Sequence, residues 1–243
     1  MTFFTYNGHS SQEFGLHIES KDVFSAPAFD MSMTSIPGRN GDLIVSNRRF
    51  SNVKVTYTVF LARKNMASLS DVLRAIKGWL YAEPDRYHEI TDSYNPGFLR
   101  LGVISEGVEI EEQLNKVGHF TVTFSCKPFL YSLAGREEIS FTESGFQITN
   151  PYPFPSKPYF RLEGNGDLSL TIQATGHNDT WQMSGILDYL ECDSEQMNFY
   201  KGTELQNLKV SGEAFPVLYP GTNTITFTGK VDGITLIPRW CCL

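Results

Sequence analysis

The sequence predicts a mainly β, largely antiparallel protein of two domains with a single α-helix. Apolar and polar residues alternate with period two along several segments, which is typical of half-buried strands. Clusters of Gly, Pro, Asn and Asp separate these segments. The chain has 243 residues, which is enough for two domains of ordinary size.

The alternation is clearest in two segments, residues 53–59 and 119–126, which are rich in the Thr, Val, Phe and Tyr that suit a pleated surface. One face of each strand is expected to be apolar: Val53, Val55, Tyr57 and Val59 in the first, and Phe120, Val122, Phe124 and Cys126 in the second. Shorter alternations follow at residues 168–173 and 224–227. Turns are predicted at residues 37–42, 95–97, 164–167 and 219–221.

One helix is predicted at about residues 68–82. Ser68 and Asp71 resemble the start of a capping box, and Pro84 ends the helical pattern. The helix has a single apolar stripe, formed by Leu69, Val72, Leu73, Ile76 and Leu80. In a β domain, such a helix is expected to cover an open face of a sheet.

The domain boundary is expected near residues 132–136, which gives domains 1–133 and 134–243. Residues 150–158 contain four prolines, so they can form neither a helix nor a central strand. We interpret them as an extended connection at the head of the second domain.

The composition indicates which classes of partner the protein can bind and in which compartment it folds. The net charge is −7 and no basic run exceeds Arg48–Arg49, so direct binding of nucleic acid is not expected. Insertion into a membrane is not expected either, because no run of ~18 apolar residues occurs. The first residues lack the features of a signal peptide, which predicts folding in a cytoplasm and free cysteine thiols. The adjacent Cys241 and Cys242 are expected to belong to a frayed C-terminus.

The motifs of common enzyme and cofactor sites are missing, so we expect no catalytic residues, metal or cofactor. The five histidines are scattered, without the spacings of metal ligands. There is no G-x-S-x-G nucleophile motif. Ser51 and Lys54 have the spacing of a catalytic pair, but on a strand they would point to opposite faces.

Two alternatives involve carbohydrate. Glu191, Asp193 and Glu195 would lie on one face of a strand about 7 Å apart, a spacing compatible with glycoside hydrolysis. A solvated sheet surface explains the same pattern, so a cell-wall glycosidase is the third choice. The second choice is a carbohydrate-binding module for host adhesion, in which Trp181 would contact the sugar by stacking. Packing in the core is the preferred interpretation of Trp181.

Several segments, in this order, resemble the distal tail (Dit) family of siphophages, the long-tailed bacteriophages with non-contractile tails. The segments are residues 4–11 (FTYNGHSS), 14–16 (FGL), 36–41 (IPGRNG), the helix with Trp79 and Leu80, 126–131 (CKPFLY), 215–225 (FPVLYPGTNTI) and 237–240 (IPRW). Together they span nearly the whole chain.

The resemblance implies a structural virion protein at the tail tip, assembled in the host cytoplasm. Residues 1–133 would be a ring-forming belt domain, a β-sandwich with the helix, and residues 134–243 a galectin-like β-sandwich. Six copies would form a hexameric ring, single or as two stacked rings, which links the tail tube protein to the tail-associated lysin or fibre protein. A receptor-binding protein would be a further baseplate partner.

The turn at Pro37, Gly38, Arg39 and Gly41 is expected to close a hairpin, because its glycines tolerate positive φ angles. We predict that this hairpin, with Arg39 at its tip, contacts a neighbouring subunit. A solvent-exposed turn without a partner is the other interpretation.

Overall fold

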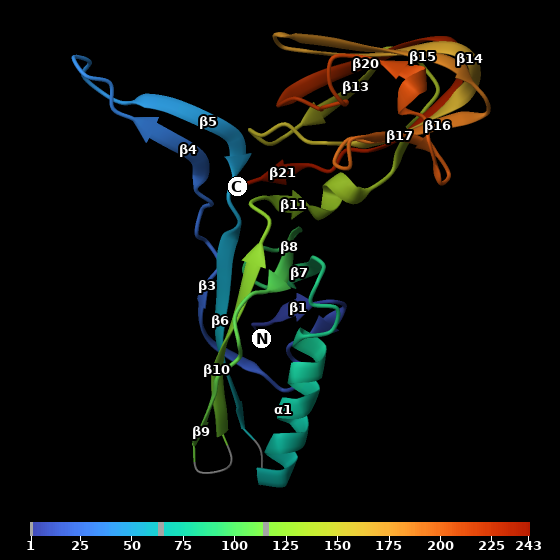
Figure 1. Cartoon of the computed structure of the whole chain (residues 1–243). Coiled ribbons are helices and arrows are strands. Elements are labelled where there is room, and N and C mark those ends of the chain that lie inside the picture. The colour runs from blue at the N-terminus through green and yellow to red at the C-terminus, as the bar shows by residue number, and fades with distance from the viewer. Residues whose placement is uncertain (1, 63–65, 114–116) are drawn as a thin grey trace. The chain divides into compact units, whose positions relative to one another are not determined.

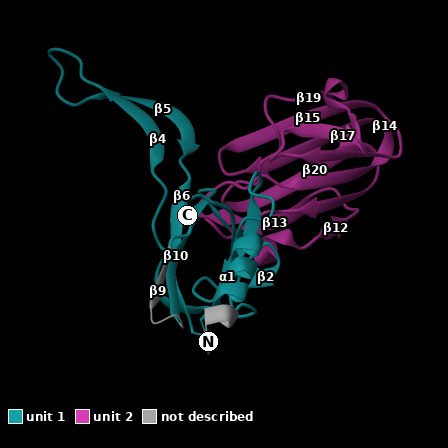
Figure 2. Cartoon of the chain, turned by 60° about the horizontal axis from the view of Figure 1, so that its bottom comes forward, with its two compact units in different colours: residues 1–130, 243 teal, residues 131–242 magenta. Residues whose placement is uncertain are grey.

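The computed structural model describes residues 2–62, 66–113 and 117–243, without the side chains of residues 66–68 and 110–113. It contains two compact units, residues 1–130 with residue 243 and residues 131–242 (Figures 1 and 2). The chain thus divides three residues before the boundary at residue 133 that we expected.

The first unit is built on an antiparallel sheet with the strand order β2-β1-β7-β8-β10-β6-β3, and β9 pairs with β10 beside β8. The strands are β1 (Phe4–Tyr6), β2 (His9–Ser10), β3 (His17–Asp22), β6 (Val53–Ala62), β7 (His88–Asp92), β8 (Phe98–Ile104), β9 (Ile110–Gln113) and β10 (Val117–Cys126). β6 and β10 pair along their whole length. All eight inward-facing residues predicted for these two strands are buried, which confirms both apolar faces.

The helix α1 (Met66–Leu80) begins two residues before the predicted start and ends two residues before the predicted end. Ser68 is therefore in its first turn rather than at the cap, and the Ser68 side chain lies outside the described residues. The apolar stripe of α1 joins the core of the first unit. Trp79 extends this contact, because its ring stacks on Phe14 and its Nε1–H donates to the Tyr6 carbonyl oxygen at 2.8 Å.

Between β3 and β6 the chain forms a separate two-stranded sheet, β4 (Phe29–Thr34) with β5 (Leu43–Phe50). Figures 1 and 2 show this hairpin, in blue and in teal, projecting from the other strands of the first unit. We call residues 29–50 the arm. The structure thus confirms the hairpin predicted around residues 37–41.

The second unit is also antiparallel, with the strand order β12-β20-β14-β16-β17-β18; β13 also pairs with β20, and β15 pairs with β14 and β19. Its strands are β11 (Leu130–Ser132), β12 (Ile139–Phe141), β13 (Phe146–Asn150), β14 (Tyr159–Ala174), β15 (His177–Ile186), β16 (Tyr189–Asp193), β17 (Asn198–Lys201), β18 (Glu204–Leu205), β19 (Val210–Ser211), β20 (Gly221–Ile237) and β21 (Cys241–Cys242). Two 3-10 turns complete it, η1 (Leu133–Arg136) and η2 (Asn207–Lys209).

The two long strands β14 and β20 run through both layers of a sandwich. The first half of β14 pairs with β16 and the second half with β15, while β20 follows β14 along both halves. Register shifts occur where the strands change layer, after Glu163 and after Asn165. A side chain at Gly164 would collide with the Lys230 carbonyl oxygen, so glycine is required where the two strands cross closely.

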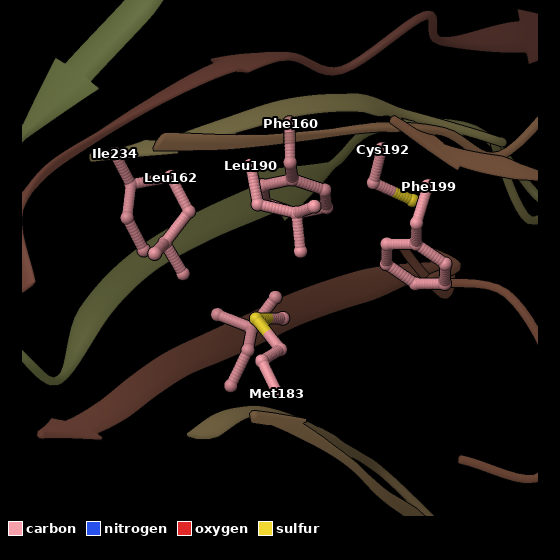
Figure 3. A pocket seen from close by; sticks show the side chains of 8 residues that line it. Phe160, Leu162, Met183, Leu190, Cys192, Phe199 and Ile234 are labelled. Carbon is pink, nitrogen blue, oxygen red and sulfur yellow. The ribbon is translucent and has the colours of Figure 1, made fainter. Parts of the chain in front are cut away.

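Apolar side chains from both layers fill the interior of this sandwich. Figure 3 shows a small cavity there, between the Met183 side chain and those of Phe160, Leu162, Leu190 and Phe199. Its lining contains no polar group other than the Cys192 thiol. The cavity is therefore a gap in core packing without groups that could orient a ligand.

The C-terminus is ordered, which corrects the expectation of a frayed end. Cys241 and Cys242 form β21, which pairs with β11. Trp240 is buried in the core of the second unit, and its carbonyl oxygen accepts the Ser132 N–H at 2.9 Å. All four cysteines are free thiols, as predicted.

Candidate interaction surface

The arm has two faces of different chemistry, which follow from its strand register. Side chains directly opposite each other in an antiparallel pair share a face, as do residues two apart along a strand. The register pairs Met33 with Ile44, Met31 with Ser46 and Phe29 with Phe50. This face, which we call the apolar face, is therefore hydrophobic along nearly its whole length.

The side chains of the apolar face are open to solvent instead of covered by a core. Met33 is 57% exposed and Ile44 59% exposed, and both Phe29 and Met31 are exposed as well. At the root of the arm the face continues into an edge-to-face contact of Phe50 with Phe129. A contiguous exposed apolar surface of this kind usually marks a contact with another protein or with a membrane.

The opposite face of the arm is mixed, with Ser32, Thr34, Leu43 and Val45. Near the root, Asp30 accepts hydrogen bonds from Asn47 Nδ2 at 2.8 Å and from Arg49 Nε at 2.6 Å. These two donors, Asn47 first, hold the pKa of Asp30 below its ordinary value.

The predicted contact residues Pro37, Gly38, Arg39 and Gly41 form the tip of the arm. Gly38 and Gly41 have φ angles of +79° and +82°, as expected for glycines in this turn. A hydrogen bond from Arg39 N–H to the Ile36 carbonyl oxygen, at 3.1 Å, closes the turn. The tip is solvent-exposed, and its contact with a neighbour stays a prediction.

The root of the arm is attached to the body of the first unit by polar contacts. The buried Arg100 donates from Nη2 to the Val23 carbonyl oxygen at 3.2 Å. In the connection between β5 and β6, Asn52 Nδ2 donates to Tyr87 Oη and Ser125 Oγ, both at 2.9 Å. These contacts fix where the arm leaves the sheet and leave both of its faces open.

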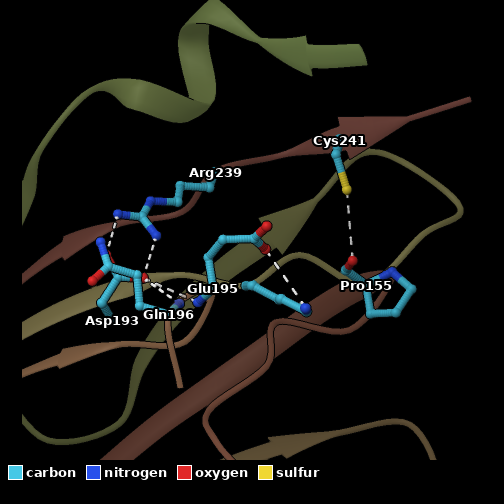
Figure 4. A network of polar contacts seen from close by, with 7 residues as sticks. Pro155, Asp193, Glu195, Gln196, Arg239 and Cys241 are labelled. Atoms are coloured by element: carbon cyan, nitrogen blue, oxygen red, sulfur yellow. Dashed lines mark hydrogen bonds and ion pairs between the residues drawn. The ribbon is translucent and has the colours of Figure 1, made fainter. Parts of the chain in front are cut away.

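The carboxylates of residues 188–195 form ion pairs and hydrogen bonds in place of a catalytic pair. Figure 4 shows those of Asp193 and Glu195. β16 ends at Asp193, so Glu195 lies in the following turn, and the expectation of one carboxylate-lined face is wrong. Asp193 is only 4% exposed and accepts from both Nη atoms of Arg239. Burial raises the pKa of Asp193, but Arg239 and two backbone N–H groups outweigh burial and lower it overall, whereas a general acid needs a raised pKa.

The suggested sugar contact at Trp181 is also corrected, because Trp181 is only 2% exposed. Its Nε1–H donates to the Ala214 carbonyl oxygen, and Gly212 lies against the indole ring. The ring is part of the core and has no free face on which a sugar could stack.

Within the residues that the structure describes, no group of three or more His, Cys, Asp or Glu side chains is placed to hold a metal ion. No helix in this part of the chain is long and apolar enough to cross a membrane.

The sequence predicted a hairpin with this turn, but it did not indicate the bounds of the two strands, β4 and β5. The available signal was the alternation of Met31 and Met33 with Ser32 and Thr34, followed across the turn by Leu43, Ile44 and Val45. Because both faces of the hairpin lie outside the core, neither strand has the clean apolar and polar alternation of a half-buried strand.

Comparison with known proteins gives the chain a family context. Residues 10–126 match the family model of the phage tail protein RIFT-related domain. The crystal structure of the Dit protein of phage SPP1, described as a paradigm of the hub adsorption apparatus in phages that infect Gram-positive bacteria, matches with a TM-score of 0.75 and 13% identity, over 97% of this chain and 98% of that one.

A chain of the phage P2 baseplate in its activated conformation with Ca matches with a TM-score of 0.51 and 6% identity, over 98% of this chain and 97% of that one. No curated protein matches the sequence. The resemblance to siphophage distal tail proteins that the sequence indicated is thus confirmed by the domain match and by the fold. Residues 10–126 thus match the phage tail protein RIFT-related domain, and the chain as a whole has the fold of the Dit protein of phage SPP1.

Proposed function

We propose that the protein is a structural hub at the distal end of a long non-contractile phage tail, where six copies form a ring. The observation that carries this proposal is the arm, which offers an exposed apolar face on a chain with a phage tail domain. The ring would link the tail tube protein to the tail-associated lysin or fibre protein, with a receptor-binding protein as a further partner. Two of the solved structures that it resembles are a hub protein and a baseplate component.

The physical chemistry of the arm supports assembly with a second copy. An isolated two-stranded hairpin is marginally stable in water, so burial of its apolar face by a partner would stabilise it. The arm has three arginines and two aspartates in a chain of net charge −7. An arm with net positive charge is therefore attracted to the acidic surface of another copy.

The two surfaces in this contact would differ, one being the arm and the other a site on the body of the next copy. Such a head-to-tail interface repeats until rotation closes a ring. A closed ring leaves no arm without a neighbour, which accounts for an exposed apolar face on the single chain. Arg39 and the tip glycines would contribute to the same interface.

The mass of the chain in solution, measured by size-exclusion chromatography with light scattering, tests the proposal. We expect a hexamer, or a dodecamer if two rings stack. Ile44→Lys introduces a charge on the apolar face and should shift the population to monomers, whereas Arg39→Ala at the tip should weaken the ring.

Val45→Lys is the matched control, because Val45 is also β-branched, exposed and next in the chain, but lies on the opposite face. It should leave the ring intact. A wild-type protein that stays monomeric at the highest soluble concentration would contradict the hub function. Equal assembly of the wild type and Ile44→Lys would exclude the apolar face as the contact.

A further inference from the structure

The tip of the arm contains an asparagine followed by glycine, a pair prone to spontaneous deamidation. The chain has three Asn-Gly pairs: Asn7–Gly8, Asn40–Gly41 and Asn165–Gly166. In this reaction the backbone nitrogen of the glycine attacks Cγ of the asparagine. Glycine favours the attack because it has no side chain to screen its nitrogen.

The structure leaves Asn40–Gly41 free to react. Both residues lie in the loop between β4 and β5 and are exposed. Among the described residues, neither the Asn40 side chain nor the Gly41 N–H takes part in a hydrogen bond. No atom lies within 4 Å of the position that a Cβ of Gly41 would occupy. The pair can therefore rotate into the geometry of attack without losing a contact.

The other two pairs are held by hydrogen-bonded structure. Asn165 lies within β14, and its Oδ1 accepts the Asp188 N–H at 3.1 Å. Asn7 occupies the tight turn between β1 and β2, and its own N–H donates to the Glu89 carbonyl oxygen at 3.3 Å. At Asn165 the hydrogen bond of the side chain must break before the Gly166 nitrogen can reach Cγ. At Asn7 the two-residue turn must open, because the pairing of Tyr6 with His9 restrains its backbone.

We propose that Asn40 is a deamidation site whose product neutralises the arm. A bond forms between Gly41 N and Asn40 Cγ, the bond from Cγ to the amide nitrogen breaks, and ammonia leaves with the proton of Gly41 N. Water then opens the cyclic imide to aspartate or isoaspartate. The arm then has three aspartates, or two with one isoaspartate, against its three arginines, so its net positive charge is lost.

The chemical step needs no assembly and applies to the free chain. Its consequence rests on the proposed function: an arm that has lost its positive charge should bind a second acidic copy less tightly. Deamidation of Asn40 would then accumulate with time in unassembled chains, because a tip enclosed by a neighbour cannot rotate into the reactive geometry.

The test is peptide mapping by mass spectrometry of the full-length Ile44→Lys variant, incubated in mildly alkaline buffer so that the tip stays free. Asn40 should convert to aspartate and isoaspartate at least about fivefold faster than Asn7 or Asn165, since Asn165 must first lose the hydrogen bond of its side chain and the turn at Asn7 must first open. Asn40→Gln should abolish conversion at the tip, because the longer side chain cyclises poorly. Equal rates at the three pairs, or an intact Asn40 amide, would overturn the proposed site.

The effect on assembly is tested in a separate experiment. It measures the mass in solution of the oligomer that the Asn40→Asp variant forms, since this variant mimics the product. We expect this variant to need a several-fold higher concentration than Asn40→Gln to form the ring. Equal assembly of the two would overturn neutralisation as a control on the ring. A monomeric wild type would contradict the hub function. The rate of Asn40 conversion would still show, independently of assembly, whether Asn40 is a deamidation site.

Discussion

Arg239 holds the buried carboxylate of Asp193 through two hydrogen bonds, from Nη1 to Oδ1 at 2.8 Å and from Nη2 to Oδ2 at 2.9 Å. Arg239 itself has a φ angle of +54°, which is unfavourable for a residue with a side chain. The ion pair therefore holds the turn between β20 and β21 on the end of β16. It accounts for the ordered C-terminus of the second unit.

Replacement of Arg239 by alanine should destabilise the second unit by about 2–4 kcal/mol, because it leaves Asp193 buried without its charged partner. Urea unfolding of the full-length protein, followed by tryptophan fluorescence, measures this loss. Lys157→Ala is the matched control, because Lys157 is exposed and pairs with Glu195 at 3.6 Å, and such surface pairs contribute little. If Arg239→Ala is as stable as the wild type, the ion pair makes no major contribution to the stability of the second unit.

Stability should also depend on pH through Asp193. Its pKa in the folded protein lies below the ordinary value of 3.8, so the folded state binds this proton less readily than the unfolded state. The resulting stabilisation is fully present above the unfolded pKa and is lost as pH falls through the folded pKa. The free energy of unfolding should therefore fall below about pH 4, and this fall should be smaller in Asp193→Asn.

Truncation after Ile237 should lower the thermal unfolding temperature, because it removes the buried Trp240 and the pairing of β21 with β11. Loss of a buried tryptophan typically costs about 3–5 kcal/mol. Differential scanning calorimetry of the full chain and the truncated chain makes the comparison. A chain that lacks only Leu243 serves as the control and should melt like the wild type.

Trypsin should cut the free chain first within the arm, at Arg39 or Arg48, because both residues are exposed and lie outside the core. Assembly should slow this cleavage if a neighbour covers the arm. Mass spectrometry of the early fragments identifies the sites. Early cleavage at Lys54 in β6 with an intact arm would contradict this prediction.

The sequence predicted those parts of the fold that have one face in a core. The apolar faces of β6 and β10 and the stripe of α1 follow from hydrophobic periodicity, and the structure confirms them. Two features had no such signal. The length of the arm was missed because its faces are not buried, and the burial of Asp193 depends on Arg239, which is 46 residues away in the chain.

Functional residues were harder to predict because their role depends on exposure. Trp181 was suggested as a sugar contact from its residue type alone, and its burial in the structure excludes that role. The tip residues Pro37, Gly38, Arg39 and Gly41 are exposed in the structure, so their predicted contact is still open to test. An exposed turn and a docking site have the same local sequence, and only a partner distinguishes them.

The continuity of β14 and β20 through both layers of the second unit has a consequence for how that unit unfolds. Neither layer can detach while the other stays intact, because the same backbone crosses from one to the other. Partial melting would expose the shared interior from both sides at once. The second unit should therefore unfold in a single cooperative transition and populate no half-open intermediate.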